Sequence, residues 1–113
     1  MILEKGEKVH IVERRYFPDD VRRHFCGEVI DSTEHLLRVA GYAWAWDART
    51  SQFIKRKSNR ERLFCLGDRL TINLLPKEAD LDNVKYSYSR EEGHMVTDSK
   101  SFSFNITEFS IIR

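Results

Sequence analysis

A two-residue alternation of side chains between His24 and Trp46 is the feature that most constrains the fold of this chain. In its first half, one face carries Phe25, Gly27 and Val29. A side-chain period of two is typical of a strand with one buried face. The short polar side chains of residues 31–33 favour a chain reversal after it. The stretch therefore predicts two extended segments joined by a turn.

The second half of this stretch, residues 36–46, is rich in small and aromatic side chains. Gly41, Ala43 and Ala45 share a face, which indicates close approach of another backbone or a tight bend there. A helix is the alternative, because Leu and Ala favour helices. Gly41 and the alternating aromatic residues favour a strand instead.

Similar short alternating segments follow along the rest of the chain, separated by polar turns. They predict an all-β protein with a single domain over residues 1–113. We expect a small five-stranded bent barrel over 8–75, ended by Pro76 because proline cannot donate to a strand ladder, and a C-terminal β-meander over 80–113. Tyr16 and Phe17 are expected to fold back as a lid over one end of the barrel.

Composition excludes several classes of protein. The formal net charge is +1 over 113 residues, so no global field attracts nucleic acid or an anionic membrane. Charged residues interrupt every apolar run before it can span a bilayer, and the charged N-terminus does not resemble a signal peptide. These features predict a cytoplasmic protein in which Cys26 and Cys65 are reduced, buried thiols. A disulfide between them is the alternative if their strands pair.

Residue types that support catalysis are present but not in a catalytic pattern. His24 and Cys26 share a strand face, yet their side chains stand side by side about 7 Å apart, so we interpret them as structural. The four histidines and two cysteines lack metal-ligand spacing, although a zinc site assembled in three dimensions stays an alternative. We therefore expect no enzyme activity, no metal and no cofactor.

The strongest candidate for function is a basic hairpin over residues 49–62. Its basic side chains, together with two tryptophans on the preceding segment, combine cationic and aromatic groups as single-strand-binding surfaces do. The candidate residues for binding nucleic acid or another partner are Trp44, Trp46, Lys55, Arg56, Lys57, Arg60 and Arg62. The alternative, which we favour, places both tryptophans in a core or a subunit interface and the cations on a solvated edge.

Two pieces of the chain resemble the motifs of the Sm-like fold, a strongly bent SH3-like barrel. The piece Gly27–Glu28–Val29, followed by Leu37 and Val39, is similar to the first Sm motif, and residues 65–72 are similar to the second. The resemblance covers residues 8–75. The chain also resembles a group of short bacterial proteins of unassigned function, through Arg22–Arg23–His24–Phe25–Cys26–Gly27–Glu28–Val29, Gly41–Tyr42 and Asn73–Leu74–Leu75–Pro76.

The Sm resemblance implies ring-like self-association through the open edges of the fourth and fifth strands, unless the C-terminal meander covers them. It does not extend to the uridine pocket of Sm proteins. The asparagine of that pocket falls at or beside Leu36–Leu37, and Leu66 takes the place of its arginine. Leucine can neither stack as a planar cation nor donate a hydrogen bond to a base.

We therefore expect a non-enzymatic binding or assembly module that self-associates into a homo-oligomer. The alternative is a protein that binds RNA or single-stranded DNA through the basic hairpin 49–62.

Overall fold

In the computed structural model, described here for residues 2–17 and 19–106, the regular secondary structure is almost entirely antiparallel strands. The strands are β1 Lys8–Glu13, β2 Arg23–Ser32, β3 Leu36–Asp47, β4 Gln52–Lys55, β5 Arg60–Cys65, β6 Leu70–Leu75, β7 Lys85–Ser89, β8 Gly93–Thr97 and β9 Ser103–Asn105. A single 3-10 turn, η1 Leu81–Asn83, precedes β7. The predicted all-β class is confirmed, and residues 36–46 form a strand rather than a helix.

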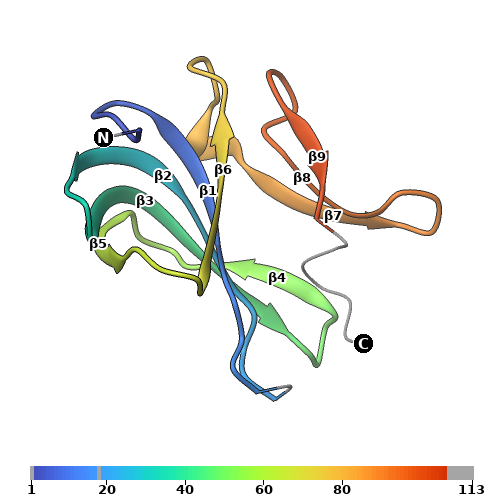
Figure 1. Ribbon diagram of the computed structural model, residues 1–113. Coiled ribbons are helices and arrows are strands. Elements are labelled where there is room, and N and C mark those ends of the chain that lie inside the picture. The colour runs from blue at the N-terminus through green and yellow to red at the C-terminus, as the bar shows by residue number, and fades with distance from the viewer. Residues whose placement is uncertain (1, 18, 107–113) are drawn as a thin grey trace.

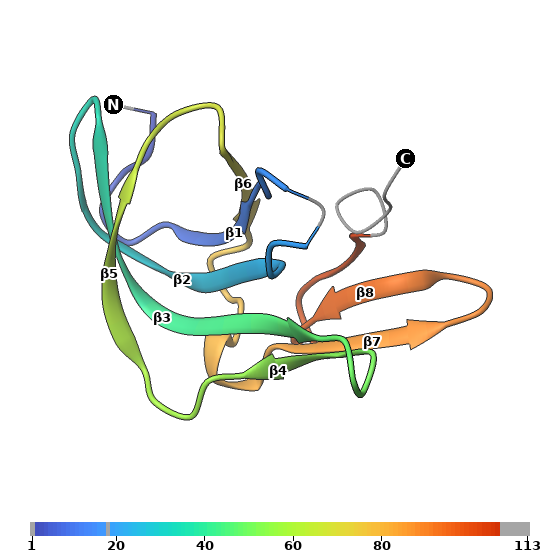
Figure 2. The same ribbon diagram turned by 90° about the horizontal axis from the view of Figure 1, so that it is seen from below.

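The first six strands form one curled sheet, in the order β4-β3-β2-β1-β6 with β5 also paired to β3 (Figures 1 and 2). This is one strand more than the predicted five. β3 is 12 residues long, so one of its edges accommodates β5 along Leu36–Gly41 and β4 along Trp44–Asp47. Among the described residues, β5 and β6 are not hydrogen-bonded to each other, so the sheet is not closed into a barrel.

A second sheet, in the order β7-β8-β9, packs against the outer face of the first. This packing gives β2 and β3 a core on each side. The inner core contains Val9, Ile11, Phe25, Val29, Leu37, Val39, Ala43 and Phe64. The core between the sheets contains Cys26, Trp44, Phe53, Val84, Val96 and Ile106. Alternate residues of the β2–β3 ribbon therefore serve two different cores.

Two expectations about individual residues are wrong. Tyr16 and Phe17 are 68% and 64% exposed and form no lid. Their backbone N–H groups donate instead to the Asp20 carboxylate, at 3.0 and 3.1 Å, which holds this segment as a surface turn. Cys65 is exposed rather than buried, because adjacent residues of a strand point to opposite faces and its neighbour Phe64 faces the core. Cys65 is not bonded to the buried Cys26.

No helix among the described residues is long and apolar enough to cross a membrane.

Candidate functional site

Strand β5 places two arginines on the concave face of the curled sheet. Arg60 and Arg62 lie on the same face of β5 as Phe64, which packs in the inner core. Glu61 lies on the opposite face and is exposed. The cross-strand partners of Arg60 and Arg62 are Gly41 and Val39 of β3. The alternation of β5 thus separates its basic side chains from its one acidic side chain.

These arginines line a cleft of about 330 Å³ together with residues of the β3–β4 hairpin and the start of β2. We call it the arginine cleft. Its lining residues are Val21, Arg23, Ala43, Trp44, Ala45, Arg56, Arg60 and Arg62. Ala43 and Ala45 leave room for the guanidinium groups, since a methyl group is the smallest side chain after the hydrogen of glycine.

The arginine cleft is a site of uncompensated positive charge. Within residues 2–17 and 19–106, no acidic side chain lines it and none of its four arginines is ion-paired with a carboxylate. Arg62 lies over the ring of Phe25, 5.5 Å from the ring centroid, which fixes its guanidinium at the end of the inner core. The Nε atom of Arg60 is buried without a hydrogen-bond acceptor. An anion in the cleft would neutralise the charge of the guanidinium groups that line it.

Only part of the predicted binding set gathers in this cleft. Arg56, Arg60 and Arg62 line it together with Trp44, and Lys57 is exposed outside it. Trp44 is 6% exposed, and its ring packs against Tyr86 in the core between the sheets, 4.7 Å between centroids. It is therefore not an exposed platform for a base.

The other two predicted residues lie on the opposite face of the hairpin. Trp46 packs against Phe53 at 5.2 Å between ring centroids. The Nζ atom of Lys55 donates to the backbone carbonyl of Asp82 at 3.1 Å and lies 4.0 Å from the centroid of the Tyr42 ring. Both side chains therefore contribute to packing at the second sheet rather than to the cleft.

Arg23 is the cleft residue that sequence reasoning missed. Arg23 lies on the same face of β2 as Phe25, and its cross-strand partner is Ala45. The alternation that identified Phe25, Gly27 and Val29 as one face extends back to Arg23 and was the signal that could have found it.

A comparison with family models, with curated proteins and with solved structures finds no match to this chain. The side chains themselves are therefore the basis for assigning a function.

A second group of polar side chains is buried between the two sheets. The hydroxyl of Tyr86 lies 3.0 Å from Nε2 of His10 and 2.9 Å from Nδ1 of His24, and these two nitrogens are 3.1 Å apart. The side-chain amide of Asn73 donates to Nδ1 of His10 at 3.1 Å. Nε2 of His10 then carries the proton and donates into the triangle, while the Tyr86 hydroxyl donates to Nδ1 of His24.

Burial keeps this group uncharged. It lowers the pKa of His10 to about 4, and burial together with His10 and Arg22 lowers that of His24 to about 3. Burial raises the pKa of the Cys26 thiol to about 12, against the opposing hydrogen bond with Tyr86 and the charge of Lys55. A buried thiol with so high a pKa is a poor nucleophile at neutral pH. The group therefore serves as a hydrogen-bonded polar core.

The described residues contain no group of three or more His, Cys, Asp or Glu side chains placed to hold a metal ion.

Proposed function

We propose that this protein is a non-enzymatic binding module that holds phosphates of single-stranded RNA or DNA in the arginine cleft. The observation that carries the proposal is the convergence of Arg23, Arg56, Arg60 and Arg62 on one cleft without a compensating carboxylate among the described residues. Guanidinium groups present paired donors that match the oxygens of a phosphate. Four like charges held together repel one another, and a bound phosphate removes that repulsion.

The shape of the site favours a single strand over a duplex. The cationic side chains line a cleft of about 330 Å³ rather than a broad face. A duplex presents its phosphates along a stiff, wide surface, whereas a single strand is flexible enough to follow a narrow basic groove. Because phosphate contacts carry no sequence information, we expect little preference among sequences from the cleft itself.

Charge reversal at Arg56 tests the cleft. We expect Arg56→Glu to weaken binding of a labelled ten-nucleotide oligothymidylate at least tenfold in fluorescence anisotropy, because it removes one phosphate contact and adds repulsion. The wild-type affinity should fall steeply as salt is raised. Lys57→Glu is the matched control, since it makes the same change in charge one residue away but outside the cleft lining. Equal losses in both variants would contradict a cleft-specific site.

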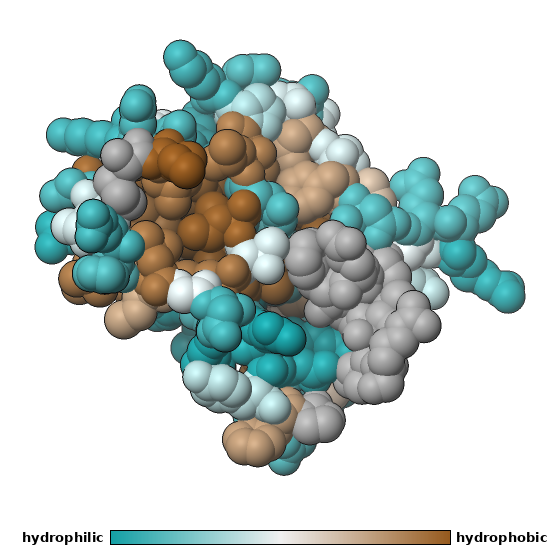
Figure 3. Space-filling model, viewed as in Figure 1, coloured by the Kyte–Doolittle hydropathy of each residue, from teal (hydrophilic) through white to brown (hydrophobic). Residues whose placement is uncertain are grey.

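We also propose that the protein self-associates and that its curled sheet is Sm-like in fold, although β5 and β6 are not hydrogen-bonded to each other among the described residues. Gly27 in β2 and Gly67–Asp68 before β6 support the likeness. The outer edges of β5 and β6 are unpaired among the described residues, and unpaired edges invite pairing with another chain. Figure 3 shows apolar surface gathered where β1, β2, β3 and β6 lie in Figure 1, and Leu74 of β6 is 62% exposed.

Solution mass tests self-association. We expect light scattering to give a multiple of the 13.4 kDa chain mass, and Leu74→Lys to lower it, because the lysine would place a charge on an apolar contact. A wild-type mass equal to one chain would contradict the proposal. Trp44→Ala is unsuitable as a probe, since Trp44 is buried within a single chain.

A further inference from the structure

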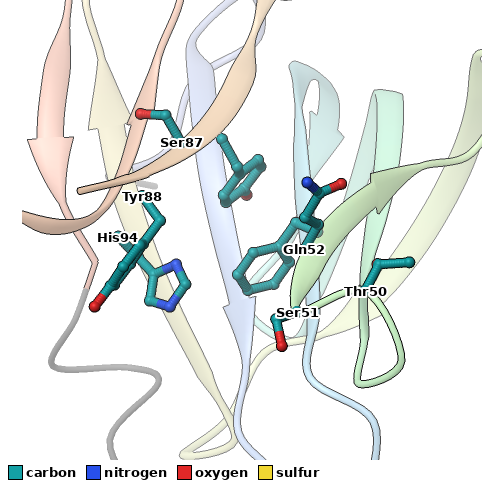
Figure 4. A pocket seen from close by; sticks show the side chains of 8 residues that line it. Thr50, Ser51, Gln52, Ser87, Tyr88 and His94 are labelled. Carbon is teal, nitrogen blue, oxygen red and sulfur yellow. The ribbon is translucent and has the colours of Figure 1, made fainter. Parts of the chain in front are cut away.

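A second cavity, of about 420 Å³, lies between the turn that joins β3 to β4 and the β7–β8 hairpin. We call it the aromatic pocket. In Figure 4, Tyr88 and His94 extend from the β7–β8 hairpin on one side, and Gln52, Ser51 and Thr50 stand on the other. The aromatic pocket shares no lining residue with the arginine cleft.

Aromatic rings from both sheets line the pocket. Phe53 of β4 is stacked on Tyr86 of β7, with 4.6 Å between centroids and 29° between the ring planes. Tyr88 packs against His94 at 4.8 Å between centroids, and the Tyr88 side chain is 64% exposed. Phe53 is buried beneath this wall, whereas the exposed Tyr88 ring offers a flat apolar face to a flat ligand at little cost in conformational entropy.

The pocket combines these rings with uncharged polar groups. Gln52 contributes an amide, and Thr50, Ser51 and Ser87 contribute hydroxyl groups. No Asp, Glu, Lys or Arg is among the described residues that line it. Burial, and then the charge of Arg22, lowers the pKa of His94, so its ring is neutral at pH 7. The ligand class that fits is an uncharged ring with hydrogen-bonding groups on its edge.

We infer that the aromatic pocket takes a nucleobase of the same single strand whose phosphates occupy the arginine cleft. This inference rests on the proposed function. The two cavities lie on opposite faces of one hairpin. Phe53 of β4 lines the aromatic pocket. Arg56, the residue after the end of β4 at Lys55, lines the arginine cleft. β4 is the end strand of its sheet, so a flexible strand that crosses its free edge passes from one cavity to the other.

Base stacking on aromatic side chains then adds to the phosphate contacts and tolerates any sequence, because every base has a flat face. A pyranose ring is the competing ligand of similar size and polarity. The cationic cleft across β4 favours the base, since a neutral saccharide would gain nothing from four arginines.

The test compares two oligonucleotides that carry the same phosphates. We expect wild-type protein to bind ten-nucleotide oligothymidylate about tenfold more tightly than an abasic oligomer of equal length. Tyr88→Ala should weaken binding of oligothymidylate about tenfold and leave binding of the abasic oligomer unchanged. Tyr88 is largely exposed, so its removal spares the fold. Tyr16→Ala is the matched control, because Tyr16 is 68% exposed and lines neither cavity.

Each outcome separates this inference from the proposed function. Equal affinity for both oligomers, with no effect of Tyr88→Ala, would overturn the base pocket and leave the phosphate cleft standing. Failure to bind either oligomer would overturn both. Binding of an uncharged oligosaccharide that Tyr88→Ala abolishes, without any discrimination between the two oligomers, would overturn the assignment to a nucleobase.

Discussion

Acidification from pH 7 to pH 4.5 is expected to lower the free energy of unfolding by several kcal/mol through the buried histidine pair. In the unfolded chain, His10 and His24 take up protons near the ordinary pKa of 6.5. In the folded chain their pKa values are about 4 and 3. Below pH 6.5 the unfolded state therefore binds protons that the folded state does not, and stability falls as the pH falls.

The slope of this dependence identifies the residues responsible. Each histidine that is protonated only in the unfolded state contributes about 1.4 kcal/mol per pH unit. His10→Gln should remove one such contribution from urea unfolding curves measured between pH 4.5 and 6. His35→Gln is the control, because the side chain of His35 is 87% exposed. An unchanged slope in His10→Gln would show that the pair does not stay neutral in the folded protein.

Two other titrating groups contribute to the dependence of stability on pH. The pKa of His94 is lowered by burial and by Arg22, so His94 adds a contribution of the same sign. At Asp98, burial acts to raise the pKa, but hydrogen bonds from the Ser101 side chain and from the backbone N–H groups of Asp80, Lys100 and Ser101 outweigh it and lower the pKa. Asp98 therefore stabilises the fold above its ordinary pKa of 3.8, outside the range chosen for the histidines.

The strands were predictable because alternation is a local property of the chain. The two segments predicted between His24 and Trp46 coincide with β2 and β3. The strand count was not predictable, because β4 and β5 share one edge of β3 and this choice of partners depends on tertiary packing. No local pattern distinguishes two short strands on one edge from two strands on separate edges.

The sequence predicted only some of the residues that form the candidate site. Local sequence identified the basic residues 56–62, since charge clusters are visible without a structure. It did not separate Lys55 from Arg56, because which face of β4 the second sheet covers is a tertiary property. For the same reason the sequence left open whether Trp44 stacks on a base or packs in a core, as we favoured; Tyr86, 42 positions later in the chain, packs on its ring. The aromatic pocket combines residues from 50–53 with residues from 86–94, and no local sequence motif indicates that these two segments meet.

Gly41→Ala is expected to destabilise the fold by about 3 kcal/mol, at the upper end of overpacking substitutions. Gly41 of β3 lies opposite Gly27 of β2. A Cβ atom at Gly41 would lie 2.0 Å from the carbonyl oxygen of Cys26 and 2.5 Å from the Cα atom of Gly27. Because both neighbours are backbone atoms, they cannot move aside as a flexible side chain would. The strands must separate, and the hydrogen bonds between them weaken. This confirms the close backbone approach that the small side chains predicted.

Urea unfolding followed by circular dichroism measures this effect, and Gly67→Ala is its matched control. A Cβ atom at Gly67 would have no atom within 4 Å, and Gly67 is exposed between β5 and β6. That substitution should leave stability unchanged or raise it slightly, because alanine restricts the unfolded chain. Nearly equal midpoints for the two variants would mean that β2 and β3 do not approach closely at Gly27 and Gly41.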